Sequence, residues 1–226
     1  HVLAADVFVE HEGSVSFGAG AAEQSAKNYQ KLTARWPLYD AEVRDFIGAD
    51  PVRTFRRNVD LARVAAQTHP RVAVASNLLG GGTERHVRET LDALSAQGES
   101  PVLLRYEDSR RVQIHVPECP DLVNLVLLLP EDRDALLAAL AQLKVKRIHF
   151  HQVIGAPGEL FQLVMDAAIP YDCTLHDYAW LCPQVNLIDA SRSYCGEPAD
   201  IRDCESCLRR SGNHKDWQTF PMFAAS

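Results

Sequence analysis

The segment Arg71-Val-Ala-Val-Ala-Ser-Asn-Leu-Leu-Gly-Gly-Gly-Thr-Glu-Arg-His-Val87 decides the fold class of this chain. Its apolar beginning, 71–76, predicts a buried strand, and the run that ends at Gly82 predicts a tight loop. Thr83 belongs to a residue type that caps helices, and apolar residues then recur at helical spacing until Gly98. A strand, a glycine loop and a helix in this order predict the first unit of a layered α/β domain.

The same alternation continues through the rest of the chain. Further strands are predicted at 101–106, 112–116, 122–129, 147–151 and 171–175, and helices at 131–144 and 158–168. This pattern predicts an α/β fold with a Rossmann-like, mostly parallel sheet and helices on both faces. We assign this domain to residues 70–226, with a Cys-rich loop at 180–208.

Residues 1–65 are predicted to form a small, mainly helical segment in front of that domain. Val7 to Val9 indicate a short strand, and the apolar spacing then indicates three helices, with breaks at Pro37 and at Asp50-Pro51. This segment is too small to bury a full core alone.

Composition and charge argue against two classes of protein, nucleic-acid binders and membrane-spanning proteins. The chain has 226 residues, 46% of them hydrophobic, and a net charge of -7. The negative charge argues against a general nucleic-acid binder, which needs a basic face. The longest apolar run, Leu122 to Leu129, is much shorter than a membrane span, and the chain does not open with a signal-peptide pattern. We therefore expect a cytoplasmic protein without a transmembrane segment.

The glycine loop is the first candidate binding element. Gly80, Gly81 and Gly82 allow a ligand to approach the backbone, and the helix that follows would offer its N-terminal amides to phosphate. The loop matches neither a dinucleotide-binding fingerprint nor a P-loop, so an ordinary strand-to-helix turn remains the alternative.

Two histidines are predicted at the same edge of the sheet. His149 and His151 share one face of a strand; we interpret His149 as a core residue and His151, nearer the strand end, as a site residue. His176 and Asp177 follow the next strand. Carboxyl ends of parallel strands meet at one edge, so these segments and the glycine loop are expected to line one cleft.

Four cysteines with the spacing C-x12-C-x8-C-x2-C predict a metal site: Cys182, Cys195, Cys204 and Cys207. Four thiolates would hold zinc in a closed, structural site that secures a loop with little apolar content. The alternatives are free thiols or a disulfide between Cys182 and Cys195, and Asp203 or His214 could replace one ligand.

Residues 71–208 resemble the N-terminal half of GT-B glycosyltransferases of the family 4 kind. The residues that carry the resemblance are Gly80-Gly-Gly-Thr-Glu-Arg-His-Val87, Ile148-His-Phe-His151, Thr174-Leu-His-Asp-Tyr178, Leu181-Cys-Pro183, Tyr194-Cys-Gly-Glu-Pro198 and Cys204-Glu-Ser-Cys-Leu208. The resemblance implies that the glycine loop approaches the donor phosphates or the acceptor, and that His176 contacts the donor sugar near the reacting carbon. It also implies that this half mainly binds the acceptor.

The first quarter of the chain resembles a different family, the carboxyl end of family 2 (GT-A) glycosyltransferases. The resemblance rests on Val9 to Gly18, Asn28 to Tyr39 and Asp50-Pro51, and it implies that His11 could complete a metal and diphosphate site. A solvated loop histidine is the alternative. The D-x-D triplet Asp132-Arg133-Asp134 opens a predicted helix, so we interpret it as structural.

Together the two resemblances imply part of a longer glycosyltransferase that moves a sugar from a nucleotide-sugar donor to a glycan or lipid-linked acceptor in polysaccharide synthesis. In such enzymes a second Rossmann half with paired glutamates holds the donor, and this sequence does not include it. We therefore expect the chain alone to be inactive, and the full protein to work in the cytoplasm or at the inner membrane face. The alternative is a zinc-stabilised, Rossmann-like binding module without transferase activity.

Overall fold

The computed structural model describes residues 20–66, 70–77, 79–178, 182, 184–196 and 201–211. The chain separates into two compact units, His1–Val52 and Arg53–Ser226. This division comes before the third predicted helix, which therefore belongs to the second unit rather than to the first segment. The strand expected at Val7 to Val9 and the candidate residue His11 lie outside the described residues.

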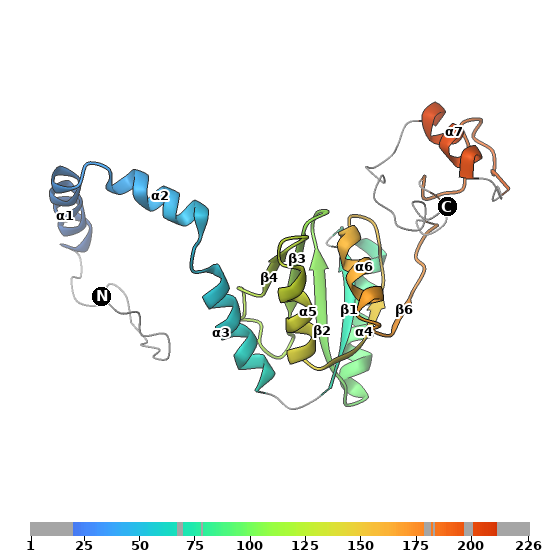
Figure 1. Ribbon diagram of the computed structural model, residues 1–226, viewed down its shortest axis with the longest axis horizontal. Helices are drawn as coiled ribbons and strands as arrows, with labels where there is room; N and C mark the ends of the chain where they lie inside the picture. The colour runs from blue at the N-terminus through green and yellow to red at the C-terminus, as the bar shows by residue number, and fades with distance from the viewer. Residues whose placement is uncertain are drawn as a thin grey trace. The chain divides into compact units, whose positions relative to one another are not determined.

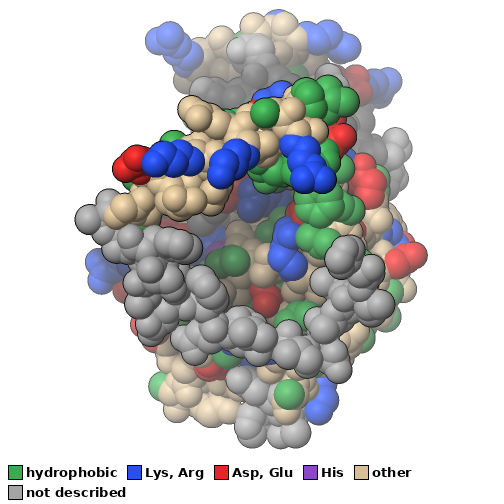
Figure 2. All heavy atoms as spheres, turned by 90° about the vertical axis from the view of Figure 1, so that its left-hand side faces the viewer, with side chains coloured by type: hydrophobic (Ala, Val, Ile, Leu, Met, Phe, Trp, Pro, Cys, Tyr) green, Lys and Arg blue, Asp and Glu red, His purple; other side chains and the backbone are tan. Residues whose placement is uncertain are grey.

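The described part of the first unit consists of helices α1 (Ala21–Arg35) and α2 (Tyr39–Ala49). Pro37 lies between them as predicted, and Asp50 ends α2 in the left-handed conformation, with φ 41°. Neither helix contains a buried residue. Large apolar side chains are instead exposed on this unit, and Figure 2 shows hydrophobic side chains at the surface among Lys and Arg side chains. Within the described residues, no helix is both long enough and apolar enough to cross a membrane.

In the described part of the chain, the second unit has a six-stranded sheet with the order β4-β3-β2-β1-β5-β6 (Figure 1). The strands are β1 (Arg71–Asn77), β2 (Ser100–Tyr106), β3 (Arg111–His115), β4 (Val126–Leu128), β5 (Val145–Phe150) and β6 (Tyr171–Cys173). β1 pairs in parallel with β2 and with β5, and β5 pairs in parallel with β6. β3 is antiparallel to both of its neighbours. The predicted α/β class is confirmed, with a mixed sheet in which parallel pairs surround β1.

Helices cover both faces of this sheet, as predicted. They are α3 (Arg53–Ala65), α4 (Gly81–Ala96), α5 (Arg133–Gln142) and α6 (Gly158–Asp166). A later helix, α7 (Ile201–Ser211), contributes none of its described residues to the two cores beside the sheet. On one face, Val87 and Leu94 of α4 pack with Val72 and Val74 of β1. The alternate residues of β1 point to the opposite face, where the larger core includes side chains of α3, α5 and α6. In Figure 1, α5 and α6 lie in front of the sheet and α4 lies behind it.

Strand β4 is shorter than the predicted strand at 122–129. The backbone N–H and the side-chain amide of Asn124 both donate to Asp60 Oδ2 of α3, each at 3.0 Å. This contact binds the chain to α3 just before β4. The register with β3 covers Arg111–Gln113, and single backbone hydrogen bonds from Ile114 to Leu125 and from Leu129 to Arg110 continue it at the two ends. Leu122 and Leu125 are still buried, which explains why the segment has the apolar pattern of a strand.

Two further predictions about local structure are wrong. The Cys-rich segment is not a continuous loop, because α7 contains both Cys204 and Cys207. The last strand ends at Cys173 rather than at 175, and its residues are exposed because β6 lies at the edge of the sheet.

The triplet Asp132-Arg133-Asp134 has the structural role that the sequence indicated. Asp132 precedes α5, and its carboxylate accepts a hydrogen bond from the Leu128 backbone at 2.9 Å. The same carboxylate pairs with Arg53 and Arg57 of α3, both at 3.1 Å, and so fastens α3 to α5.

Candidate functional site

The glycine loop connects β1 to α4 by an abrupt turn. Gly80 and Gly81 have φ values of 75° and 73°, in the left-handed region that favours glycine. Because of this turn, α4 begins at Gly81 with Gly80 as its N-cap, and the predicted cap at Thr83 is wrong. All three glycines are exposed, so the first amides of α4 are accessible to an anion.

A network of buried polar side chains fixes the segments on either side of this loop. Arg105 of β2 donates to the Asn77 carbonyl and to Glu84 Oε1 of α4, both at 2.6 Å. The Asn77 amide in turn donates to the Ile154 carbonyl at 3.0 Å. The ends of β1 and β2, the first turn of α4 and the segment after β5 are therefore fixed to one another.

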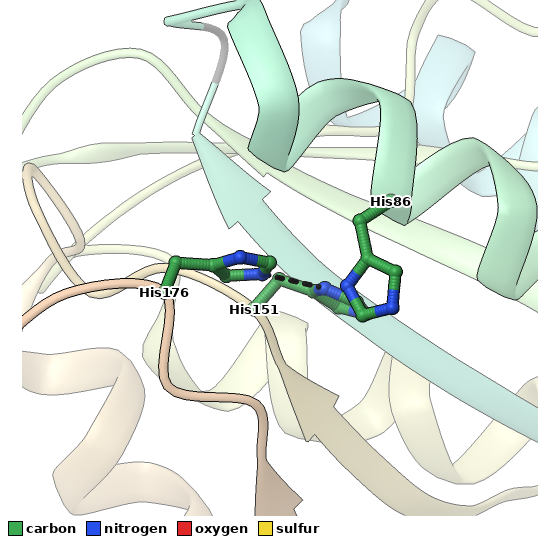
Figure 3. A group of neighbouring side chains, drawn as sticks. All are labelled: His86, His151 and His176. Carbon is green, nitrogen blue, oxygen red and sulfur yellow. Dashed lines mark hydrogen bonds between the residues drawn. The ribbon is translucent and has the colours of Figure 1, made fainter.

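Three histidines meet beside this loop (Figure 3). His151 Nδ1 lies 3.1 Å from His176 Nε2, and one of these nitrogens donates to the other. The ring of His86, from α4, meets both rings edge-on, with centroids 5.0 Å from that of His151 and 5.3 Å from that of His176. One ligand nitrogen from each residue lies within 4.8 Å of the other two. The structure thus brings together the predicted pair and adds His86, which the sequence analysis did not select.

Burial sets the charge state of this histidine cluster, His86, His151 and His176. His151 is only 1% exposed, and its burial, with the neighbouring imidazoles, lowers its pKa to about 3. Burial and then the charge of His86 also lower the pKa of His176. Both rings are therefore neutral at physiological pH and can offer a nitrogen lone pair to a proton or to a metal ion.

His149 is hydrogen-bonded on both ring nitrogens. Its Nδ1 donates to Asp172 Oδ1 at 2.5 Å, and its Nε2 shares a hydrogen bond with the Thr174 hydroxyl at 2.9 Å. It was expected to be a core histidine; it is instead partly exposed, 19% by side chain, because β6 lies at the sheet edge. Its ring centroid is 4.6 Å from that of His151, so it forms a wall of the cluster.

Asp177 is fixed by the segment that follows β5. Its Oδ2 accepts from Gln152 Nε2 at 2.8 Å, and Gln152 Oε1 accepts from the backbone amides of Val153 and Ile154. The segment after β6 is thereby attached to the segment after β5, and this holds His176 opposite His151.

The four cysteines line one cavity of about 240 Å³, together with Asp203 and other side chains. Burial and the nearby charges of the other three cysteines raise the pKa of Cys204. In the described part of the chain, however, the group of three or more such ligands within 4.8 Å is the histidine cluster. The four cysteines thus share a cavity, but among the described residues the group of potential metal ligands is formed by the histidines. His214, the other suggested ligand, lies outside the described residues.

Comparisons with protein-family models, with curated proteins and with solved structures found no match to this chain. The residues at the carboxyl edge of the sheet are therefore the guide to function.

Proposed function

We propose that the second unit is the acceptor-side half of a GT-B-like glycosyltransferase, which acts on a nucleotide-sugar donor and a glycan or lipid-linked acceptor. The supporting observation is that the glycine loop, His151 and His176 all follow parallel strands and meet at one edge of the sheet. The chain crosses from β1 to β2 on one side, whereas β5 lies on the other side of β1. Ligands of open α/β folds bind at such a switch point.

In this proposal each group has a separate role. The amides after Gly80 and Gly81 face phosphate oxygens of the donor or acceptor, and the neutral ring of His176 contacts the donor sugar. His151 and Asp177 hold His176 in place and line the acceptor side. Donor binding needs a second Rossmann half, and a lipid-linked acceptor would place the reaction at the inner face of a membrane.

The test is sugar transfer by the natural gene product that contains this chain. Radiolabelled nucleotide sugars serve as donors and lipid extracts as acceptors. His176→Ala should lower turnover by about 100-fold, the usual loss when a transition-state hydrogen bond is removed. His115→Gln, a partly buried histidine on β3 away from the glycine loop, is the matched control and should keep its activity. Equal activity in His176→Ala and wild type, or no transfer from any donor, would refute the proposal.

We also propose that Cys182, Cys195, Cys204 and Cys207 hold a structural zinc ion, which would suit a binding module as well as a transferase. The cavity that the four cysteines share supports this proposal. Zinc-bound thiolates should resist a maleimide until a chelator is added, whereas exposed Cys173 should react at once. If all of these thiols react equally fast in zinc-loaded protein, the zinc proposal is wrong.

A further inference from the structure

We propose that His86, His151 and His176 form a binding site for one divalent transition-metal ion, with Zn²⁺ as the best match. The proposal does not depend on transferase activity or on the cysteine cavity. The three side chains come from separate parts of the fold: α4, the residue after β5 and the segment after β6. Figure 3 shows their rings directed toward one another.

The spacing of the nitrogens fits a shared ion. Two imidazole nitrogens that bind one tetrahedral Zn²⁺ at 2.0–2.1 Å lie about 3.3 Å apart. His151 Nδ1 and His176 Nε2 are 3.1 Å apart, close to this value. One ring nitrogen of His86 lies within 4.8 Å of a ring nitrogen of each of the other two residues. His86 is exposed, so a small rotation of its side chain can complete the set without disturbing the core.

The buried member of the cluster is incompletely hydrogen-bonded. Among the described residues, His151 Nε2 is buried and has no hydrogen-bond partner, although its Nδ1 contacts His176. An unsatisfied buried polar atom costs about 1–3 kcal/mol. An ion on Nδ1 does not contact Nε2, so the metal site is inferred from the arrangement of the three rings and not from this atom.

The ligand set identifies the class of metal. Imidazole nitrogens suit Zn²⁺, Cu²⁺, Ni²⁺ and Fe²⁺, whereas Mg²⁺ and Ca²⁺ prefer oxygen ligands. Three histidines leave a fourth position open, as in catalytic rather than structural zinc sites. Because His86 is exposed, that position can reach solvent, and it would take water or an oxygen anion such as phosphate or carboxylate.

The experiment measures Zn²⁺ binding to the full chain after chelator treatment, without nucleotide sugar. Equilibrium dialysis gives the number of ions bound, and NMR of the histidine rings shows which residues bind them. We expect the wild type to bind one more equivalent than His86→Ala, whose affinity at this site should fall by at least about 100-fold, beyond the range for second-shell losses. The exposed position of His86 makes this variant safe for folding, and His115→Ala is the matched control.

The cysteines do not confuse the result, because they are present in every variant compared. Ring signals of His86, His151 and His176 should shift on addition of Zn²⁺, while the signal of His115 should not. Equal stoichiometry in wild type and His86→Ala, or unshifted ring signals at saturating Zn²⁺, would overturn the proposal. Neither outcome bears on sugar transfer, which is measured separately.

Discussion

Replacing Glu84 by Ala should destabilise the second unit far more than an ordinary surface substitution on α4. Glu84 carries the carboxylate that faces the guanidinium of Arg105, with 2.6 Å between Nη2 and Oε1. The Arg105 side chain is only 7% exposed, and the Glu84 side chain is 24% exposed. The substitution therefore leaves a buried positive charge with the Asn77 carbonyl as its remaining acceptor from this network.

The expected loss follows from the burial of this pair. Removing one partner of a buried ion pair costs roughly 3–5 kcal/mol, because the other charge stays desolvated. Since water can reach Glu84 in part, we expect the lower end, about 3 kcal/mol. Ala is a better helix former than Glu, so helix propensity does not contribute to the loss. Arg105→Met in the same background removes the stranded charge, and the double variant should be less destabilised than the sum of the two single variants by about 2 kcal/mol.

Urea unfolding followed by far-UV circular dichroism at pH 7 measures these differences. The matched control is Glu89→Ala, which removes an exposed pair between Arg85 and Glu89 on the same helix, and it should cause no measurable change. If Glu84→Ala has as little effect as Glu89→Ala, or if the effects of the Glu84 and Arg105 substitutions simply add, the ion pair does not hold the glycine loop in the way inferred here.

Three other outcomes can be checked by the same unfolding assay. Gly81→Ala should lower the free energy of unfolding by roughly 1–2 kcal/mol because Gly81 has a positive φ. Gly82→Ala should leave the free energy of unfolding unchanged or raise it, and the reverse order would contradict the turn geometry. Tyr106→Phe should raise the free energy of unfolding by about 1 kcal/mol, because the buried hydroxyl has no hydrogen-bond partner among the described residues; a loss would mean that it has one. Burial, and then the charge of Arg105, lowers the pKa of His115 below its unfolded value of about 6.5, so stability should fall as pH falls below 6.5. His115→Gln should make stability depend less on pH in this range. If the slope of stability against pH is the same in the variant and the wild type, His115 is not the cause.

The alternation of strands and helices could be predicted from sequence because it depends on local patterns. The apolar run at 71–76 became β1, and Gly98 and Pro37 end or separate helices as expected. The convergence of His151 and His176 was also predictable, because parallel strands place their carboxyl ends at one edge.

Features that depend on contacts between distant residues were not predictable. Asn124, just before β4, is hydrogen-bonded to Asp60 of α3, and the two residues lie far apart in sequence. Helix α7 was missed because Cys204, Cys207 and Leu208 were considered as ligands and loop residues, although their spacing of three to four residues places them on one helical face.

His86 was not predicted as a site residue because it lies on a helix and not at the end of a strand. It lies on a helix next to buried Val87, and an exposed helical histidine alone suggests no role. The usable signal was its distance from the glycine loop: His86 lies just over one helical turn beyond Gly82, so it stays near the edge where β1 ends.

The strand order explains why the imidazoles of α4, β5 and the segment after β6 can meet at all. α4 packs against one face of the sheet, and α5 and α6 pack against the other. His149 of β5 is paired with Val74, which packs against α4, and His151 lies on the same face two residues later, so the sheet does not separate His151 from His86. At the carboxyl edge the chain after β1 turns at Gly80 and Gly81, while the chain after β5 continues to His151, whose backbone amide still donates to the Ala75 carbonyl at 2.9 Å. The turn at the two left-handed glycines starts α4 directly after β1, and this places His86 of α4 near the end of β5.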